Sequence, residues 1–336
     1  MNSKKWLYGV IVGTFIILLL HFVFLYKVDT YSIINVNKGK TYTIPNQRFL
    51  IAEYLLSSKP KGYDTFIFGS SRVGYINPLK IENKKAYNMT YGEGIPHEHF
   101  LFLKLLLKNN ITIKEILVGL DDFSPQISFS EHDNSFGSKL HYKALGISKF
   151  QFYSFYFLRT IRSADIKHFK KKYLGYQADF SLNEHIYNTI FNQEVTYQNS
   201  KYVNNNTTEH NNNPAFTVPT INKGNNLKGS LQDIQDIIEL CKKNNIKYTF
   251  FINPIHKTTY NALDIHFFNN FKKELSYITD YYDFSLPSII NNNNQYWNET
   301  SHYSLLVGDM ILNRIYDNNK TIENFGKYIS IQKKGE

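Results

Sequence analysis

Two short stretches of the chain carry residues that could perform nucleophilic chemistry, and the first of them ends at Ser71. Residues 64–68 form an apolar, β-prone run that stops at Gly69-Ser70-Ser71. Such a run predicts a buried strand that delivers a small hydroxyl residue to the end of a sheet. Glycine permits a tight turn there, and a serine can act as a nucleophile when a base lies within reach. The same pattern also fits a plain strand end whose serines cap the following helix.

The second stretch contains Glu299 and His302, separated by two residues. A carboxylate three residues before a histidine can accept the imidazole Nδ1 proton, which leaves Nε2 to act as a base. The apolar run at 305–316 predicts a helix directly afterwards, and this helix would hold the histidine rigidly. The alternative is an ordinary helix start, because Glu299 and Ser301 also suit the first turn of a helix.

The remaining reactive residue types give weaker signals. His256 follows a predicted strand at 246–252, where ligand sites of open α/β sheets collect, so it could bind substrate hydroxyls. A loop histidine satisfied by its neighbours is the simpler explanation. The single cysteine, Cys241, cannot form an intramolecular disulfide and lies in a predicted helix. The other histidines are scattered without the spacing of metal ligands, so we expect no metal and no cofactor.

The elements that must position these residues alternate between strands and helices. Strands are expected near residues 64–68, 86–89, 115–120, 246–252 and 282–285, and helices near residues 47–57, 97–108, 231–245, 262–278 and 305–316. This alternation predicts an α/β domain with a mostly parallel sheet covered on both faces.

Residues 6–26 are almost entirely apolar, with Thr14 and His21 as the polar side chains inside. About 20 such residues span a hydrocarbon core, and no cleavage pattern follows, so we expect an uncleaved signal anchor. A buried helix of a soluble protein is the alternative. Lysines flank both ends nearly equally. Because long domains are translocated across a membrane regardless of their charge, we expect the short amino-terminal end on the inner side of the membrane and the large domain on the outer side. Residues 28–46 are expected to form a polar, extended stem.

The composition favours a folded chain with an anionic partner. Hydrophobic residues make up 42% of the 336 residues, and the formal net charge is +10. A basic balance suits nucleic acid, anionic lipid or an anionic polymer. Because no zinc-finger spacing, basic zipper or aromatic RNA-binding signature accompanies it, we favour an envelope surface and expect no nucleic acid partner. An ordinary lysine-rich surface fits equally well.

Residues 125–225 interrupt the alternation of strands and helices. The first half is basic and aromatic, which predicts either a helix packed on the main domain or an amphipathic surface that touches the membrane or an acyl donor protein. The second half is rich in asparagine and predicts a loop. The expected organisation is an anchor at 1–27, a stem and short helix at 28–59, and an α/β domain at 60–336 with an insertion at about 125–225.

The order of the two chemical stretches resembles that of the SGNH (GDSL-like) hydrolases, over roughly residues 60–125 and 230–316. In that family the nucleophile ends the first core strand, and an acid-x-x-histidine motif precedes the last helix. More narrowly, the chain resembles the membrane-anchored envelope branch, which includes alginate O-acetyltransferase-type proteins and the D-alanyl transfer protein of teichoic acid modification. The resemblance implies a three-layer, flavodoxin-like fold on one N-terminal transmembrane helix.

The resemblance also implies roles for individual residues. Ser71 would be the nucleophile, His302 the base and Glu299 the acid, where the family more often has aspartate. The family's oxyanion glycine falls in the loop at 88–94, and we favour Gly92 over Gly94 for that role.

Two positions depart from the family pattern. Ser70 stands where aspartate is usual, and Asp121 lies in the block at 119–122, where typical members carry Gly-x-Asn-Asp. An asparagine side chain can donate a hydrogen bond to an oxyanion, whereas an ionised aspartate cannot, and loss of one such donor costs about 100- to 1,000-fold in rate. Either backbone amides hold the oxyanion or Asp121 has another task. We expect Asp121 to pair with Arg72 and so fix the turn that carries the nucleophile.

The function implied by the resemblance is serine-dependent acyl transfer or ester hydrolysis on a bacterial cell-envelope polysaccharide. The implied partners are the polysaccharide or its acyl donor, including a membrane-bound acyltransferase. The implied location is the cytoplasmic (inner) membrane, with an extracytoplasmic globular domain. The alternative is a catalytically silent relative that binds glycan or scaffolds a complex for polysaccharide modification or export.

Overall fold

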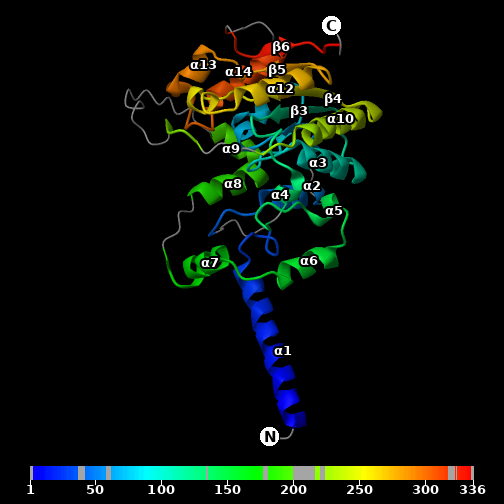
Figure 1. The fold of residues 1–336 in the computed structure, drawn as a ribbon, viewed down its shortest axis with the longest axis vertical. Coiled ribbons are helices and arrows are strands. Elements are labelled where there is room, and N and C mark those ends of the chain that lie inside the picture. The colour runs from blue at the N-terminus through cyan, green and yellow to red at the C-terminus, as the bar shows by residue number, and fades with distance from the viewer. Residues whose placement is uncertain are drawn as a thin grey trace. The chain divides into compact units, whose positions relative to one another are not determined.

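The computed structural model describes residues 3–36, 42–57, 62–133, 135–176, 181–199, 216–219, 224–316, 322 and 324–333. The chain forms two compact units (Figure 1). We call residues 1–53 and 135–190 the N-terminal unit, and residues 54–134 and 191–336 the sheet unit. The insertion expected at 125–225 is therefore divided between them, because its middle part packs with the N-terminal residues.

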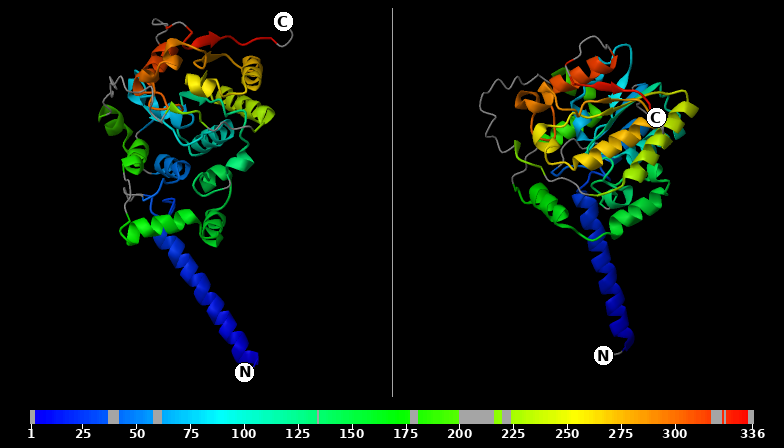
Figure 2. Two further views of the ribbon diagram at one scale, coloured as in Figure 1. Left: turned by 60° about the vertical axis from the view of Figure 1, so that its left-hand side comes forward. Right: turned by 45° about the horizontal axis from the view of Figure 1, so that its top comes forward.

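The N-terminal unit is built on helix α1 (Ser3–Val28), which matches the span predicted for residues 6–26. Its most apolar window has a mean hydropathy of 2.4, and α1 is the one helix among the described residues that is long and apolar enough to cross a membrane. Helices α6 (Lys149–Leu158) and α7 (Ser163–Tyr173) contact α1 and lie beside its C-terminal end (Figure 2). A membrane anchor is compatible with this helix.

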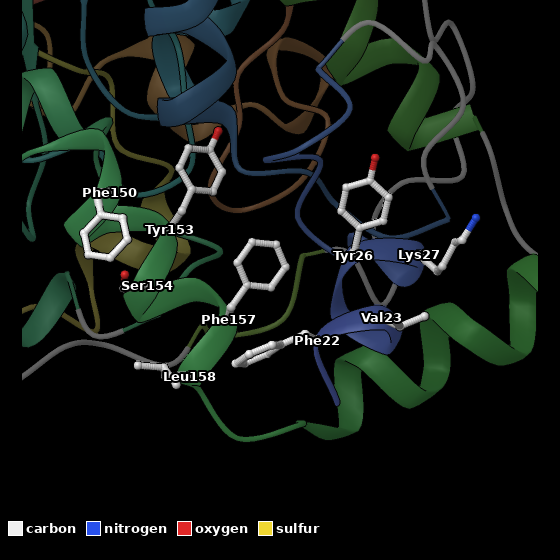
Figure 3. Close-up of a pocket in the computed structure, with 9 residues that line it drawn as sticks. All are labelled: Phe22, Val23, Tyr26, Lys27, Phe150, Tyr153, Ser154, Phe157 and Leu158. Atoms are coloured by element: carbon white, nitrogen blue, oxygen red, sulfur yellow. The ribbon is translucent and has the colours of Figure 1, made fainter. Parts of the chain in front are cut away.

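Helix α6 joins α1 through a small aromatic core. Phe152 and Tyr156 of α6 are fully buried together with Leu25 of α1 and Phe49, and the rings of Phe49 and Phe152 stack 5.4 Å apart. The opposite side of α6 lines an open pocket against α1 (Figure 3). The aromatic stretch predicted to pack on the main domain therefore packs on the N-terminal helix.

The prediction of an extended stem at 28–46 is wrong for the first residues of this segment, which form a turn. Asp29 has a left-handed backbone (φ 45°), and its carboxylate accepts hydrogen bonds from the backbone N–H groups of Ile33, Ile34 and Asn35. Ile33 is fully buried. One acidic side chain thus folds the polar segment into a tight turn, and its apolar residues join the core. Residues 37–41 lie outside the described residues.

Within the part of the chain that the structure describes, the sheet unit contains six strands in the order β2-β1-β3-β4-β5-β6. The first five are parallel and match the predicted strands, whereas β6 runs antiparallel to β5. The strands are β1 (Thr65–Phe68), β2 (Ala86–Asn88), β3 (Glu115–Leu120), β4 (Lys247–Ile252), β5 (Tyr281–Asp283) and β6 (Lys327–Ile329). The chain is therefore an α/β protein with a mostly parallel, mixed sheet, and the sequence did not predict β6.

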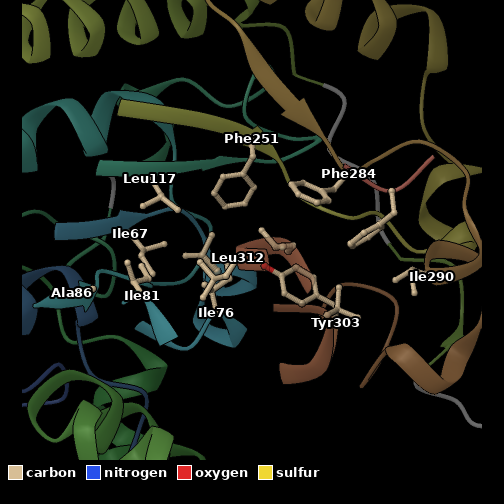
Figure 4. Packing of buried hydrophobic residues seen from close by; sticks show 14 of the residues in the cluster. Ile67, Ile76, Ile81, Ala86, Leu117, Phe251, Phe284, Ile290, Tyr303 and Leu312 are labelled. Carbon is tan, nitrogen blue, oxygen red and sulfur yellow. The ribbon is translucent and has the colours of Figure 1, made fainter. Parts of the chain in front are cut away.

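Helices pack on both faces of this sheet, which explains why every residue of β1 and β3 is buried. Ile67, Leu117 and Phe251 point to one face, where they form a core with helix α14 (Leu305–Tyr316) (Figure 4). Phe68 points to the other face, where its ring lies 5.8 Å from that of His99 in helix α3 (Pro96–Lys108).

The predicted helices of the sheet unit are present with shifts of a few residues at their ends. The remaining helices and turns given for the described residues are α2 (Gln47–Leu56), α4 (Phe129–His132), α5 (Tyr142–Leu145), α8 (Ser181–Phe191), α9 (Gln193–Asn199), α10 (Leu227–Lys243), α11 (Lys257–Tyr260), α12 (Ile265–Ser276), α13 (Ile289–Asn292), η1 (Ser71–Tyr75), η2 (Pro78–Lys80) and η5 (Asn294–Tyr296). Helix α14 contacts the turn η1, which begins at Ser71. This contact brings the two chemical stretches of the sequence together.

Candidate active site

Ser71 is the first residue of the turn η1, directly after strand β1. Ser70 caps this turn, because its Oγ accepts a hydrogen bond from the Arg72 backbone N–H at 3.2 Å. A Cβ atom on Gly69 would lie 2.4 Å from Val73 Cγ1, so only glycine fits the tight bend between strand and turn. The predicted strand end and the predicted serine cap are thus both present, and they present Ser71 at the carboxyl end of β1.

His302 lies on a short hairpin that precedes α14. Trp297 and Tyr303 form an antiparallel bridge, and the Asn298 N–H donates to the His302 carbonyl at 2.9 Å. The hairpin places His302 Nε2 at 2.7 Å from Ser71 Oγ. This distance lies within the range that a general base needs to accept a serine proton.

Glu299 completes a chain of three side chains. His302 Nδ1–H donates to Glu299 Oε1, and the Ser301 backbone N–H donates to Glu299 Oε2 at 2.8 Å. Partial burial acts to raise the pKa of Glu299, but these hydrogen bonds and the charge of Arg72 outweigh it and lower the pKa below its usual value. Because Glu299 is ionised near neutral pH and accepts from Nδ1, His302 Nε2 is left to accept the Ser71 proton.

Arg72 connects the nucleophile turn to the residues around it. Its Nη1 donates to Asp121 at 3.0 Å and to Asp122 at 2.5 Å, which confirms the predicted pairing with Asp121 and adds a second carboxylate. Its Nε donates to the Ser301 carbonyl at 3.0 Å, next to His302. Although burial acts against the charge, the two carboxylates raise the pKa of Arg72 above its usual value. The guanidinium therefore fixes both the turn of Ser71 and the hairpin of His302.

Sequence reasoning missed the polar side chains beneath this ion pair. Asn253 follows β4 and is fully buried, and its Nδ2 donates to Asp121 Oδ1 at 3.1 Å. Its Oδ1 accepts from the Tyr303 hydroxyl at 3.1 Å. Desolvation by burial is the main reason that the pKa of Asp121 lies above its usual value. Its place in the sequence could have identified Asn253, because a residue directly after β4 lies beside the residue directly after β3, which is Asp121.

A cavity of about 310 Å³ opens over Ser71 and His302. Gly92, Asp122 and Phe123 also line it. Gly94 instead packs tightly on the strand behind the site, where a Cβ atom would lie 2.7 Å from the Gly69 carbonyl oxygen. Gly92 therefore lines the cavity and Gly94 does not, while the role of Gly92 in holding an oxyanion stays a prediction.

His256 is placed apart from the other predicted site residues. It is fully buried, its Nδ1 accepts from the Thr258 backbone N–H at 3.2 Å, and its Nε2 bonds to Asn294 Oδ1 at 2.9 Å. Burial is the main cause that lowers its pKa. His256 caps helix α11 and does not line the cavity over Ser71, so the structure offers it no contact with a substrate hydroxyl.

The site lies where the connections of the sheet change direction. From β1 the chain leads to β2 on one side, and the next strand, β3, pairs with β1 on the other side. Ligands of open α/β sheets bind at this point, outside the carboxyl ends of the strands. Ser71 follows β1 and Asp121 follows β3, so both arise at this edge. Across the described residues, the carboxylates, histidines and cysteine form no cluster that could hold a metal ion.

The arrangement can activate a serine hydroxyl beside a cavity large enough for a small acyl or sugar group. The structure brings together Ser71, His302, Glu299, Arg72 and Asp121, and Gly92 lines the same cavity. No protein-family model matches the chain, and a comparison with curated proteins likewise gives no match, so the geometry alone carries the functional argument.

Proposed function

We propose that the protein is a serine-dependent acyltransferase or esterase. One observation carries this proposal: Ser71 Oγ lies 2.7 Å from His302 Nε2, while Glu299 accepts the hydrogen bond of Nδ1–H on the other side of the ring. A structural serine at a strand end needs no base at this distance and no carboxylate behind the base. Nucleophile, base and orienting acid in this order are the parts of an activated serine.

In the proposed reaction, Ser71 Oγ attacks an ester carbonyl as its proton passes to His302 Nε2. Glu299 stabilises the imidazolium that forms and keeps Nδ1 protonated. The imidazolium then returns the proton to the departing alkoxide, which leaves an acyl group on Ser71. Water or a sugar hydroxyl then gives its proton to His302 Nε2 and attacks the acyl carbon. The bond from this carbon to Ser71 Oγ breaks, and the imidazolium returns the proton to Ser71 Oγ. Water releases an acid, whereas a sugar hydroxyl forms a new ester.

Backbone amides are proposed to stabilise the oxyanion. Ser71 and Gly92 both line the cavity, and their N–H groups need no side chain to donate. Asp121 is unsuited to this task, because it accepts hydrogen bonds from Arg72 and Asn253. Its proposed role is to hold Arg72, which in turn positions Ser71 and the hairpin of His302.

The strand order supports the fold that the sequence resemblance implies. The first five strands follow the order 2-1-3-4-5 of flavodoxin-like sheets, with helices on both faces. We assign the sheet unit to this three-layer architecture, and specifically to an SGNH-like domain. The assignment rests on analogy of fold and motif order, and the chemistry rests on the site itself.

The proposed substrate is an ester on a cell-envelope polysaccharide. An apolar helix suited to anchoring supports a membrane location, and the net charge of +10 suits an anionic polymer. We place the sheet unit outside the cytoplasmic membrane, where it would receive acyl groups from a donor such as a membrane-bound acyltransferase. The orientation of α1 is part of this proposal.

The test is labelling of the full chain in detergent with a fluorescent fluorophosphonate, which reacts with activated serines. We expect the wild-type protein to be labelled and both Ser71→Ala and His302→Ala to lose the label. Ser70→Ala is the matched control, since the neighbouring hydroxyl caps η1 and accepts no proton in the proposed reaction. This variant should retain labelling.

The outcomes separate the enzyme from the alternative of a silent glycan-binding or scaffolding protein. Labelling that persists in Ser71→Ala would show that another residue reacts and would refute the site. A folded wild type that reacts neither with the probe nor with a small acetyl ester would refute the proposed chemistry. Labelling lost in both variants would leave the natural acceptor to be found, with purified envelope glycans as candidates.

A further inference from the structure

Helix α6 has two apolar faces, and only one of them is buried in the core. Phe152 and Tyr156 are fully buried, whereas Phe150 is 84% exposed and Leu158 is 68% exposed. The second face lines a pocket of about 640 Å³ against the last turns of α1. Its residues follow the i, i+3, i+4, i+7, i+8 spacing of a helical stripe: Phe150, Tyr153, Ser154, Phe157 and Leu158. A helix that is apolar on both sides requires a second apolar partner.

The position of this pocket along α1 indicates what that partner is. The rings of Phe22 and Phe157 lie 6.1 Å apart, and His21 Nε2 lies 3.1 Å from the Phe157 carbonyl oxygen. If the hydrocarbon span begins at Trp6, about 20 residues carry it to Leu25. At 1.5 Å per residue, Phe22 then lies about 5 Å inside the hydrocarbon boundary. The pocket therefore opens at the depth where acyl chains meet their headgroups.

The lining of the pocket is almost entirely apolar, and the hydroxyl groups of two tyrosines mark one end of it. The hydroxyl groups of Tyr26 and Tyr153 point to the same side, away from Phe22 and Leu158 (Figure 3). The Tyr153 hydroxyl donates to the Ile33 carbonyl at 3.2 Å, which fixes this direction. An amphiphilic ligand fits such a site, with its chain between the apolar side chains and its head beside the hydroxyl groups.

Lysine side chains lie around the C-terminal end of α1. Lys27 lines the pocket, and Lys172 Nζ donates to the Lys27 carbonyl at 2.7 Å, which docks α7 on the end of α1. Lys167 and Lys170 of α7 are exposed. The acidic residue of α7, Asp165, is buried and paired with a neighbouring arginine, so it does not offset these lysines. The charge favours an anionic headgroup.

We propose that α6 and α7 lie in one face of the bilayer that α1 crosses, and that the pocket between α1 and α6 holds an acyl chain of an anionic phospholipid. The headgroup lies beside Lys27 at the end of α1. This inference depends on α1 being in the membrane and is independent of any reaction at Ser71. It makes the N-terminal unit a lipid-binding module as well as a tether.

The test places a fluorophore in the pocket of the full chain, reconstituted in phosphatidylcholine vesicles containing phosphatidylglycerol. Leu158→Cys is labelled with a nitrobenzoxadiazole dye, and Lys273→Cys on α12 of the sheet unit is the matched control. Wild type serves as the blank, because Cys241 is buried and burial raises the pKa of its thiol to about 12. Phospholipids carrying a nitroxide either near the headgroup or at the chain end quench the dye according to its depth.

We expect strong quenching at position 158, greater with the shallow nitroxide than with the deep one, and none at position 273. Equal quenching at the two positions would overturn the proposal. A dye at 158 that is shielded from water yet insensitive to both nitroxide lipids would also overturn it, because a protein would then occupy the pocket.

A second comparison tests the charge. A nitroxide on phosphatidylglycerol should quench the dye at position 158 more than one on phosphatidylcholine. The variant Lys27→Gln, which removes the lysine that lines the pocket, should lower this preference by about fivefold. Lys242→Gln with Lys243→Gln on α10 is the matched control and should leave it unchanged. Equal quenching by the two lipids in the wild-type background would overturn the anionic assignment.

Discussion

Replacement of Arg72 by methionine tests whether the buried ion pair holds the candidate site together. The substitution keeps an unbranched side chain and removes the guanidinium that bonds Asp121, Asp122 and the Ser301 carbonyl. Two carboxylates then face each other without a cation, and Asp121 is fully buried. We expect Arg72→Met to destabilise the sheet unit strongly and to slow labelling of Ser71.

The size of the effect follows from the burial of the group. Removing one partner of a buried ion pair costs about 3–5 kcal/mol, a large fraction of the 5–15 kcal/mol that typically stabilises a domain. The pKa of Asp121 is already raised by burial and rises further without Arg72. When the pKa of a carboxyl group is higher in the folded protein than in the unfolded chain, the free energy of unfolding decreases as the pH rises above the unfolded pKa. The gap between wild type and Arg72→Met should therefore narrow as the pH falls toward 5.

Asp121→Asn is the control that separates charge from shape. The amide oxygen can still accept from Arg72 Nη1 and from Asn253 Nδ2, and Asp122 still neutralises the guanidinium. We expect a change of no more than about 1 kcal/mol, the scale of one ordinary hydrogen bond.

The assay is unfolding of the full chain in detergent with urea, followed by the fluorescence of Trp297, which is buried in the sheet unit. Probe labelling is measured under conditions where each variant is folded. An unchanged midpoint for Arg72→Met would refute the reasoning, and so would a loss in Asp121→Asn as large as that in Arg72→Met. Arg72→Lys should not rescue labelling fully, because an ammonium lacks the planar fork that reaches three acceptors.

Three further predictions follow from single contacts. Glu299→Gln should lower the labelling rate by about 10²- to 10⁴-fold without unfolding the protein, because the amide no longer stabilises the imidazolium; an unchanged rate would contradict this role. Asp233→Asn should destabilise the protein mainly at acidic pH, since the hydrogen bond that His97 Nδ1–H donates to Asp233 raises the pKa of His97 above its usual value. That stabilisation is complete below the unfolded pKa and is lost as the pH rises through the folded one, so thermal midpoints of variant and wild type should converge in alkali. Gly308→Ala should cost about 1–3 kcal/mol, because its Cβ would lie 1.9 Å from the Tyr75 carbonyl oxygen and push α14 away from η1; a midpoint equal to that of wild type would argue against this close contact.

The sequence predicted those elements and contacts that depend on residues close together in the chain. Strands β1 and β3 are short apolar runs that end in turn-forming residues, and both are buried throughout. The spacing of Glu299 and His302 predicts a hydrogen bond within one turn, and the structure contains this bond in the hairpin before α14. The pairing of Asp121 with Arg72 was expected from chemistry, since both follow neighbouring strands.

What the sequence could not predict depends on contacts between distant segments. Strand β6 has three residues and exists through its pairing with β5, so no local pattern marks it. The grouping of residues 135–190 with the N-terminus depends on packing such as that of Phe152 on Phe49, more than a hundred positions apart. Asn253 belongs to no sequence motif, and only its place after β4 marks it; its partners are Asp121 after β3 and Tyr303 in the hairpin before α14.

The two members of the Ser71–His302 pair are 231 residues apart in the chain, and this separation has a consequence for synthesis. The ribosome makes the nucleophile early and the base late, so a growing chain exposes Ser71 without any group to take its proton. Only when α14 and the hairpin before it dock on η1 does the serine gain its base. If Ser71 is the proposed nucleophile, the chain is therefore synthesised with an inert hydroxyl, and the serine becomes reactive only after the last helix has docked.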